Sequence, residues 1–330
     1  MDKKVSIITP CFNGEQFVGR YLDSILNQTY KNIELIFVND GSNDKTEEIV
    51  KSYINKFNRV GMNLIYLYQK NLGQAAAINQ GLKIFTGEYL TWPDSDDILA
   101  YDSIEKKVNF LKKNSQYGLV RTDAKLVNEE NLEQIIGYFS EGNTNKYKEK
   151  LFMDLITENK VWFAPGCYML RSSAFLDMNS DRRIYEGKGG QNWQMLLPIM
   201  YRYKCGYIDE PLYTYVIRSS SHSHSSISLE SQLKKCDEHE DILINTFNYI
   251  NMNDEEQKEY ITIVREKYIR KRFNLACEWN NKVLAEKYYY ILKDKCICSF
   301  DDKIMYLSSR NIIFNVIYKV IRKIGLVFIK

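Results

Sequence analysis

The stretch that says most about the fold is Tyr89-Leu90-Thr91-Trp92-Pro93-Asp94-Ser95-Asp96-Asp97. Its apolar first half predicts a buried strand over residues 88–92, and three carboxylates follow within four residues. Carboxylates this close repel each other, and a divalent cation such as Mg²⁺ or Mn²⁺ relieves the repulsion by binding their oxygens. Strand ends in open α/β sheets are also where ligands bind. We therefore expect a metal and ligand site here. The alternative is that Ser95 or Asp96 caps a helix beginning near Ile98.

The residues before this stretch alternate strand and helix patterns. Strands are expected over 5–9, 33–38 and 64–68, and helices over 16–28, from 46 through 53, and over 74–85. This βαβαβαβ order predicts a doubly wound parallel sheet with its polar loops at the carboxyl ends of the strands. Three such loops, 9–15, 39–44 and 94–97, are predicted to form a nucleotide site with a metal. Because the sequence has no GxGxxG and no GxxxxGK[ST], we expect a metal ion rather than a glycine loop to hold the phosphates.

The later residues give weaker patterns. We expect a helix over 98–116, mixed segments to 164, a strand over 162–170, a helix over 191–203 and a strand over 207–216. A Ser/His-rich loop over 219–228 follows, and then long polar helices over 229–251 and 254–293. This organisation predicts an α/β domain over 1–220, a helical extension over 221–310 and a separate segment over 311–330.

Composition predicts an ordinary soluble protein. The 330 residues are 45% hydrophobic and 26% charged, and the net charge of +3 gives no sign of a nucleic-acid partner. Seven cysteines without a CxxC spacing are interpreted as reduced packing thiols of a cytosolic protein, with no zinc site. Lys3 and Lys4 lead straight into a strand, so we expect no signal peptide, and no window is apolar enough for a membrane span.

The last twenty residues have the pattern of a basic amphipathic helix. Their polar stripe is formed by Asn311, Asn315, Lys319, Arg322, Lys323 and Lys330, and apolar residues cover the rest. A wide apolar face with only positive charges is typical of an anchor on an anionic membrane surface. The alternative is a terminal helix docked on the protein's own core or on a homodimer partner.

Four motifs in order resemble family 2 glycosyltransferases, which are inverting enzymes with a GT-A fold that use nucleotide-diphosphate sugars. The motifs are Val5-Ser6-Ile7-Ile8-Thr9-Pro10-Cys11-Phe12-Asn13-Gly14, Val38-Asn39-Asp40-Gly41-Ser42-Asn43-Asp44-Lys45-Thr46, Asn71-Leu72-Gly73…Ala77-Ile78-Asn79-Gln80-Gly81 and Asp94-Ser95-Asp96-Asp97. The resemblance covers roughly residues 4–220. It implies a mixed, mainly parallel sheet flanked by helices, followed by a helical C-terminal region.

The resemblance also assigns residue roles. Donor binding would involve Thr9, Pro10, Phe12, Glu15, Asp40, Asn71, Gly73, Asp94 and Ser95. Asp40 would accept the uracil N3–H, which excludes cytosine but leaves UDP- and dTDP-sugars open. Asp96, with Asp94, would hold the Mn²⁺ or Mg²⁺ that bridges the two phosphates, and Asp97 would lie behind them. The alternatives are strand-end packing for Thr9 and Phe12 and an Asx-turn at Asp40.

One departure from the family concerns the general base that takes the proton of the acceptor hydroxyl. The family places a Glu-Asp pair at the start of a late helix, where this sequence has Gln191 and Asn192. An amide is no general base near neutral pH. We expect Glu186, or Asp181, to take the role, with Gln191 and Asn192 at the acceptor site. Other interpretations are that Asn192 only orients the acceptor, that the two amides cap a helix, or that the domain binds without catalysis.

The residues after the last strand are a weaker candidate. Relatives often place a basic residue or a histidine near the diphosphate here, which suggests Arg218, His222 or His224. A solvated Ser/His loop is the simpler interpretation for residues 219–226.

The metal site and the resemblance together predict a metal-dependent hexosyltransferase, and the resemblance implies bacterial capsule, exopolysaccharide or O-antigen synthesis. It would move a single sugar from a UDP-sugar to a hydroxyl of a glycan that we expect to be lipid-linked, while attached to the inner face of the cell membrane. One rival is a polyprenyl-phosphate sugar synthase, in which Arg182, Arg183 and Lys188 bind the lipid phosphate. A second is a non-catalytic module that binds a nucleotide-sugar or glycan.

Overall fold

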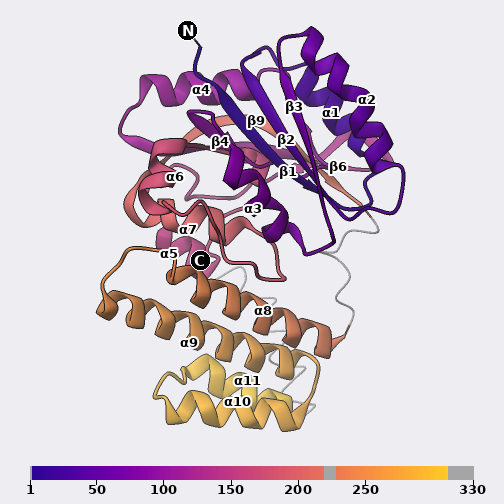
Figure 1. Cartoon of the computed structure of the whole chain (residues 1–330). Helices are drawn as coiled ribbons and strands as arrows, with labels where there is room; N and C mark the ends of the chain where they lie inside the picture. Colours follow the sequence, from indigo (N-terminus) through magenta and orange to yellow (C-terminus); the bar gives the residue numbers. More distant parts are fainter. Residues whose placement is uncertain (1, 219–227, 311–330) are drawn as a thin grey trace. The chain divides into compact units, whose positions relative to one another are not determined.

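The computed structural model describes residues 2–218 and 228–310. The chain divides into two compact units (Figure 1). Unit 1 contains residues 1–221 and 245–251, and unit 2 contains residues 222–244 and 252–330. The sheet and the predicted site lie in unit 1.

Four parallel strands form the first half of unit 1. They are β1 (Val5–Cys11), β2 (Ile33–Asp40), β3 (Asn63–Gln69) and β4 (Tyr89–Thr91), in the spatial order β3-β2-β1-β4. Every residue of β1 and β2 is buried, as expected when helices cover both faces of a parallel sheet. The predicted doubly wound arrangement is confirmed.

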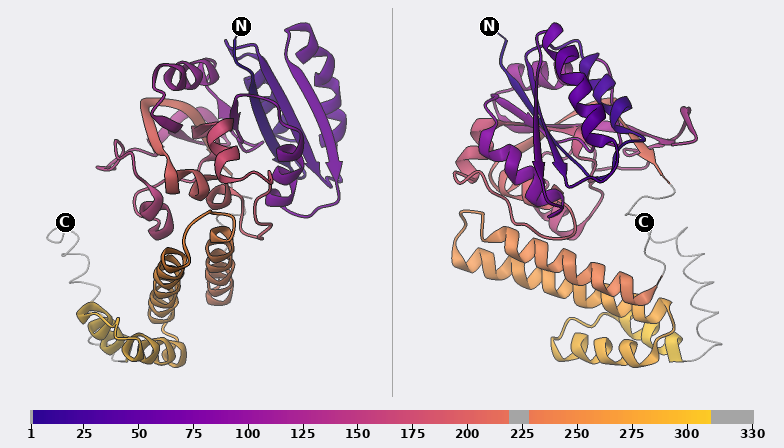
Figure 2. Two further views of the ribbon diagram at one scale, coloured as in Figure 1. Left: turned by 60° about the vertical axis from the view of Figure 1, so that its left-hand side comes forward. Right: turned by 45° about the vertical axis from the view of Figure 1, so that its right-hand side comes forward.

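Helices cover this half on both faces. The helices α1 (Val18–Leu26) and α2 (Thr46–Arg59) lie side by side on one face, and α3 (Gln74–Ile84) covers the other (Figure 2). The buried stripe of α1 contains Val18, Tyr21, Leu22 and Ile25, which have helical spacing. A Cβ at Gly81 would lie 2.4 Å from the Ile8 side chain, so this glycine lets α3 approach β1 closely.

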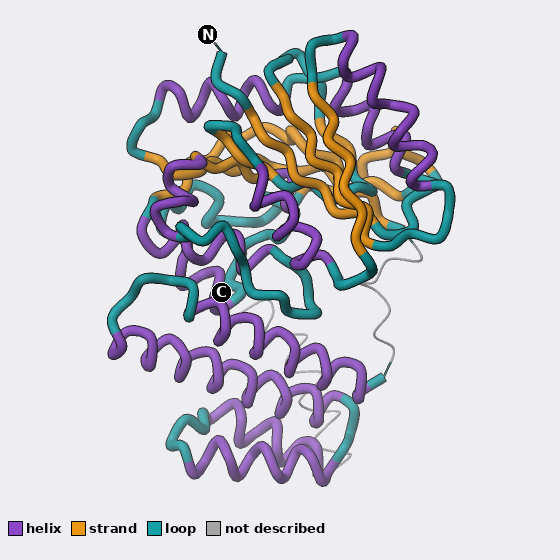
Figure 3. Tube along the Cα trace, viewed as in Figure 1, coloured by secondary structure: helices purple, strands orange, loops and turns teal. Residues whose placement is uncertain are grey.

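The second half of unit 1 continues the same sheet (Figure 3), and its strands run in mixed directions. The order runs on from β4 through β8 (Tyr168–Arg171), β6 (Tyr117–Asn128) and β9 (Lys204–Ile217) to β5 (Ile98–Leu99), and β7 (Asn131–Tyr138) pairs with β6. Four helices flank these strands: α4 (Ser103–Lys113), α5 (Phe152–Thr157), α6 (Ser172–Met178) and α7 (Asn192–Arg202). This is the mixed α/β architecture that the sequence predicts.

The expected helix over 98–116 begins later than predicted. Ile98 and Leu99 form β5, which pairs antiparallel with β9, and α4 begins only at Ser103. The Asp97 carboxylate accepts the Val216 N–H at 2.9 Å and so fixes this turn to β9. The alternative that Ser95 or Asp96 caps a helix is therefore wrong.

The expected strand over 162–170 is also shorter. A 3₁₀ turn, η1 (Pro165–Cys167), occupies its middle, and β8 starts at Tyr168. Pro165 has no N–H to give to a strand ladder, and the Lys107 ammonium donates to the Gly166 carbonyl at 2.5 Å. Both effects favour the turn over a continuous strand.

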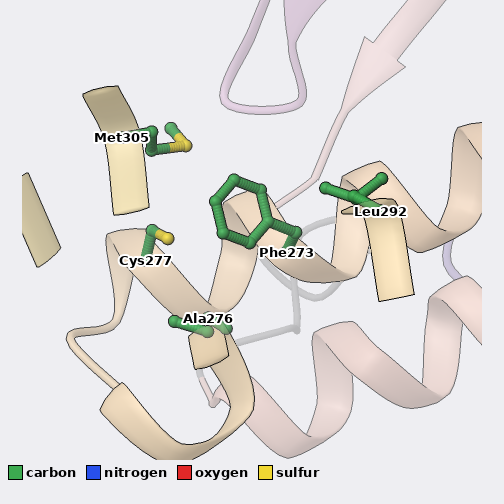
Figure 4. Packing of buried hydrophobic residues seen from close by; sticks show 6 residues of the cluster. Phe273, Ala276, Cys277, Leu292 and Met305 are labelled. Carbon is green, nitrogen blue, oxygen red and sulfur yellow. The ribbon is translucent and has the colours of Figure 1, made fainter. Parts of the chain in front are cut away.

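Unit 2 is helical and comprises most of α8 (Leu229–Phe247), with α9 (Asp254–Glu278), α10 (Lys282–Asp294) and α11 (Phe300–Arg310). Its core includes Phe273, Ala276, Cys277, Leu292 and Met305 (Figure 4). The single helix expected over 254–293 is wrong. Asn280 has a φ of +53°, and the Asn281 side chain caps α10 by accepting the Leu284 N–H at 3.1 Å.

Two further expectations concern the whole chain. All seven cysteines are free thiols, five of them buried, in agreement with a packing role. Within residues 2–218 and 228–310, none of the helices combines the length and apolar character that crossing a membrane requires. The predicted amphipathic helix over 311–330 lies outside the described residues.

Candidate active site

The strand order places the predicted site at a reversal of the chain's winding. From β1 the chain moves to β2 and β3 on one side, and then returns to β4 on the other side of β1. The ladder between β1 and β4 ends at Ile7 and Thr91, where β4 itself ends, so the carboxyl end of β1 has no ladder partner in β4. A crevice outside the carboxyl ends of such strands is the usual ligand site of a doubly wound sheet.

The loops after β1 and β2 are joined by hydrogen bonds in both directions. Asn13 N–H donates to Ser42 Oγ at 2.9 Å, and Asn43 N–H donates back to Asn13 Oδ1 at 2.9 Å. Glu15 repeats the pattern, since its N–H donates to Asp44 at 2.9 Å and its carboxylate accepts the Lys45 N–H at 3.0 Å. The predicted donor residue Glu15 therefore fixes the two loops to each other.

Three predicted donor residues at the end of β1 have different environments. Thr9 is fully buried and its hydroxyl pairs with the Tyr21 hydroxyl, and Pro10 is buried as well. Phe12 is 42% exposed, which leaves its ring available to a nucleobase. The packing alternative therefore describes the Thr9 side chain, whereas the Phe12 side chain is exposed to solvent.

Asp40 anchors the loop that precedes α3. Its Oδ1 accepts from Gln69 at 2.6 Å and from the Leu72 N–H at 2.9 Å, and its Oδ2 accepts the Gly73 N–H at 2.9 Å. Gly41 has a φ of +77°, and a Cβ there would lie 2.6 Å from the backbone nitrogen of Asn71. The structure thus brings Asp40, Asn71 and Gly73 together.

The Asx-turn that we considered for Asp40 is formed by its neighbour. Asn39 Oδ1 accepts the Ser42 N–H at 2.9 Å, while the Asn39 amide donates to the Tyr66 hydroxyl at 2.9 Å. Asn39 therefore shapes the turn and leaves the Asp40 carboxylate to the 71–73 loop.

The three carboxylates after β4 are held by different groups. Asp96 forms an ion pair with Arg218 at 2.5 Å, and its backbone carbonyl accepts from Arg20 at 2.7 Å. Asp97 is 1% exposed and holds Val216. Asp94 Oδ1 accepts from Gln191 at 3.3 Å. Ser95, between them, is buried.

Burial acts strongly on two of these carboxylates. Desolvation, and then the charge of Asp96, raise the pKa of Asp94 to about 7. Desolvation and the same neighbouring charges hold the pKa of Asp97 well above its usual range. Both carboxyls therefore keep their protons to a higher pH than usual, and a cation bound to Asp94 would displace its proton and stabilise the charged form.

The residues present fit a divalent cation that shares its ligands with a bound diphosphate. Among the described residues, no group of three or more His, Cys, Asp or Glu side chains is arranged as a complete metal site. However, Asp94 and Asp96 offer hard oxygen ligands, and Arg218 already places a cation on Asp96. Asp97 Oδ2 is buried with no hydrogen-bond partner. Mg²⁺ and Mn²⁺ sites of this kind take their remaining ligands from phosphate and water.

Gln191 and Asn192 link the Asp94 carboxylate to the backbone at Phe163. Gln191 is 2% exposed and donates to Asp94. Asn192 accepts from the Trp92 indole at 3.4 Å and donates to the Phe163 carbonyl at 2.9 Å. The Gln191 side chain makes no capping hydrogen bond to α7, so the capping alternative is wrong for this residue.

Glu186 lies beside α3. Its carboxylate accepts from Asn79 at 2.9 Å and is 3.8 Å from Arg183. Asn79 is 2% exposed and also bonds both backbone groups of Ile184, at 2.8 and 3.0 Å. Asn79 therefore fixes the segment that carries Glu186, a role that the sequence motif containing it did not reveal.

The other candidates are less central. Asp181 is exposed and accepts from Ser180 at 3.4 Å. Arg182 donates to the Phe85 carbonyl at 3.1 Å and lies over the Phe85 ring, so it and Arg183 already have partners. Arg218, a weak candidate from sequence, is at the site on Asp96, and its guanidinium lies 4.3 Å from the Phe17 ring. Arg20 gave no sequence signal. His222 and His224 lie outside the described residues.

Known proteins share parts of this chain. An uncharacterised glycosyltransferase of Rickettsia typhi is 46% identical over 109 residues, which is 33% of this chain and 32% of that protein. The minor teichoic acid biosynthesis protein GgaB of Bacillus subtilis is 29% identical over 227 residues, 66% of this chain and 23% of that protein. The chain thus matches about a third or less of the length of these relatives.

A solved structure matches over more of the chain. The crystal structure of S. aureus TarS 1–349 in complex with UDP-GlcNAc aligns with a TM-score of 0.59 and 17% identity, covering 93% of this chain and 91% of that one. This likeness shows the fold. The model of the glycosyl transferase family 2 matches residues 6–178, just over half of the chain. The match contains the motifs that place Asp40, Asp94 and Asp96 at the end of the parallel strands, and the chain belongs to glycosyl transferase family 2.

Proposed function

We propose that this protein is an inverting glycosyltransferase of bacterial surface-polysaccharide synthesis, which moves one sugar from a UDP-sugar to a glycan hydroxyl. The observation that carries the proposal is the shared edge of the parallel sheet: Asp40 ends β2, and Asp94 and Asp96, which is paired with Arg218, follow β4. GgaB, a teichoic acid biosynthesis protein, and TarS, which is seen with UDP-GlcNAc, support the same class.

Phe12 and Asp40 are the proposed base-recognition residues. A carboxylate offers about four lone pairs, and Asp40 uses three of them on Gln69, Leu72 and Gly73. The remaining lone pair of Oδ2 can accept the N3–H of uracil or thymine. Cytosine has no such N–H, so UDP- and dTDP-sugars are the candidate donors.

Asp94 and Asp96 are the proposed ligands of Mn²⁺ or Mg²⁺. A bound cation would neutralise charge on the departing nucleoside diphosphate. Asp96 presents Oδ2 to Arg218, so a cation bound to this oxygen would compete with the ion pair. Arg218 would then be available to a donor phosphate.

Glu186 remains our proposed general base, and Gln191 and Asn192 are proposed acceptor-site residues. Asn79 orients the Glu186 carboxylate through a hydrogen bond to Oε1 and leaves Oε2 for the acceptor proton. The two amides favour a second candidate function, a module that binds a nucleotide-sugar without transferring it. The polyprenyl-phosphate alternative is weakened because Arg182 and Arg183 already contact Phe85 and Glu186.

We further propose that the acceptor is lipid-linked and that the protein works at the inner membrane face. Three apolar side chains of α11 are well exposed: Phe300 at 74%, Ile304 at 36% and Leu307 at 58%. Their spacing puts them on one helix face, directly before the basic amphipathic sequence 311–330. A homodimer through this face is the competing arrangement.

The test is a donor panel. The purified chain is incubated with Mn²⁺ and UDP-, dTDP- or GDP-sugars, and nucleoside-diphosphate release is measured with and without membrane lipid extract. Release from one donor, raised by the extract and lost in Asp96→Ala, supports the transferase. Calorimetric binding of UDP with no release from any donor would favour the binding module.

A further inference from the structure

A second hollow lies on the acceptor side of unit 1, between residues 139–143 after β7 and residues 160–163 before η1. Its volume is about 370 Å³, and its lining includes Phe139, Glu141, Asn143, Lys160, Trp162 and Phe163. We propose that this acceptor pocket binds one pyranose ring of the acceptor glycan. The inference rests on the proposed transferase function and names the substrate group that this part of the site would take.

Hydrogen bonds within the protein join the two walls of the acceptor pocket. The Asn143 amide donates to the Lys160 carbonyl at 2.7 Å, and the Lys160 ammonium donates to the Thr144 hydroxyl at 2.8 Å. The Phe139 N–H donates to the Ala124 carbonyl of β6 at 3.0 Å, which ties one wall to the sheet. A pocket held in this way is largely formed before binding.

Trp162 gives the pocket an unused hydrogen-bond donor. The side chain is 4% exposed, and the Arg121 guanidinium lies 4.5 Å from its ring. The Tyr168 hydroxyl fixes its carbonyl at 2.8 Å. Its Nε1 is buried with no partner among the described residues. Buried donors without partners are rare in native proteins, so we infer that this N–H pairs with a ligand oxygen once the pocket is filled.

The other lining groups match the chemistry of a sugar ring. Phe139 and Phe163 are partly exposed aromatic rings, which suit the apolar C–H face of a pyranose. Glu141 can accept from ring hydroxyls, whereas Asn143 and Lys160 can donate to them. Because Glu141 and Lys160 carry opposite charges, the pocket favours a neutral sugar over a phosphate.

Hydrogen bonds link the wall of the acceptor pocket to the Asp94 carboxylate. Asn192 donates to the Phe163 carbonyl in the pocket wall at 2.9 Å and accepts from Trp92 at 3.4 Å. Its neighbour Gln191 donates to the Asp94 carboxylate at 3.3 Å. The two amides at the family's usual base position therefore bridge the acceptor pocket and the donor carboxylate. They are positioning residues for both substrates.

Indole NMR on the full chain tests the pocket directly. The protein has four tryptophans, so ¹⁵N-Trp labelling gives up to four indole N–H signals, and Trp162→Phe identifies the signal of Trp162. The probes are methyl glycosides of glucose, galactose and N-acetylglucosamine, added in the presence of UDP, with glycerol phosphate as an anionic comparison. We expect at least one glycoside to shift the Trp162 signal and to leave the signal of Trp279, in unit 2, in place.

The second measurement is transfer kinetics with the donor that the panel of nucleotide-sugars identifies. Removing one hydrogen bond should raise the KM for the active glycoside about fivefold in Trp162→Phe, with a smaller change in the donor KM. The matched Trp279→Phe variant should keep wild-type constants.

Three results would overturn the acceptor pocket. The first is a Trp162 signal that shifts with UDP and with no other probe. The second is a signal that shifts with glycerol phosphate but with no glycoside. The third is a signal that shifts with no glycoside although the protein turns over the donor. A glycoside-induced shift in a chain that turns over no donor would support the pocket and count against the transferase instead.

Discussion

The donor half and the acceptor half of unit 1 are built on different plans. The donor half, β1 to β4, is a parallel sheet whose site residues follow directly after strand ends. In the acceptor half, β8 runs antiparallel to both neighbours, and the site residues come from the long connections around β7, η1 and α7. The proposed donor site therefore depends on short sequence motifs, whereas the proposed acceptor site depends on contacts between distant segments.

The largest expected effect is on the donor half. Asp96→Ala removes a proposed metal ligand and the partner of Arg218, so kcat should fall about a hundredfold to a thousandfold, as for loss of a charge-stabilising group. Nucleoside-diphosphate release measures the rate, and Mn²⁺ EPR measures metal binding independently. The exposed Asp301 of α11 provides the control variant, Asp301→Ala. Wild-type Mn²⁺ binding in Asp96→Ala would remove Asp96 from the metal site.

The next largest effect is expected at Asn79, which joins α3 in the donor half to the 182–191 segment. Asn79→Leu removes three hydrogen bonds and leaves the backbone groups of Ile184 unpaired. We expect the free energy of unfolding to fall by about 2–4 kcal/mol, and transfer to weaken because the 182–191 segment loses its anchor. Urea unfolding and calorimetric UDP affinity separate the two effects. A large loss of UDP affinity at unchanged stability would instead make Asn79 a donor-site residue.

One titratable group in each half should change the free energy of unfolding with pH, and the two changes should have opposite signs. The folded pKa of Asp94, about 7, is above its usual 3.8, so the folded chain holds the extra proton between these values and the free energy of unfolding falls as pH rises. Asp94→Asn should remove about 2–3 kcal/mol of this fall, measured by urea unfolding of metal-free protein at pH 4 and pH 8. Equal pH slopes in the variant and the wild type would contradict this.

Lys107, behind η1, should show the reverse trend. Burial lowers its pKa from 10.5 to about 8, so the unfolded chain holds the extra proton between these values and stability rises with pH. Lys107→Met should flatten this rise by about 1–2 kcal/mol between pH 8 and pH 10. The exposed Lys303→Met is the control. A rise that survives in Lys107→Met must come from another group.

The smallest expected effect is at the nucleobase. Phe12→Leu keeps an apolar side chain but loses the aromatic face, so UDP affinity should fall about threefold to tenfold. Calorimetry with UDP measures this, and Tyr68→Leu, at another exposed aromatic side chain, is the comparison. Unchanged affinity in Phe12→Leu would place the base elsewhere in the crevice.

Sequence patterns predicted the donor half well because its signals are local. Buried β-branched runs ending in polar motifs gave β1, β2 and β4 and placed Asp40 and Asp94 at strand ends. The contacts that complete the site join residues far apart in the chain: Asp97 to Val216, Asn79 to Ile184 and Gln191 to Asp94. No periodicity reports such pairs.

The acceptor half was harder to predict for a related reason. The strands β6 and β7 include many polar and charged residues, and β6 buries Arg121 completely against Trp162 and three carbonyls. A buried arginine looks like a surface residue in sequence. The same holds for Asn280, whose positive φ separates α9 from α10 although the helical pattern continues through it.

The reciprocal hydrogen bonds between the 12–17 and 42–46 loops have a thermodynamic consequence. Ordering a loop costs conformational entropy, and a protein that orders its loops during folding does not incur this cost again when a ligand arrives. In this chain the two loops are already ordered in the folded state by the hydrogen bonds of Asn13, Glu15, Ser42 and Asp44. We therefore expect the affinity for a donor at the proposed site to depend partly on these side chains, which fix the backbone of the two loops.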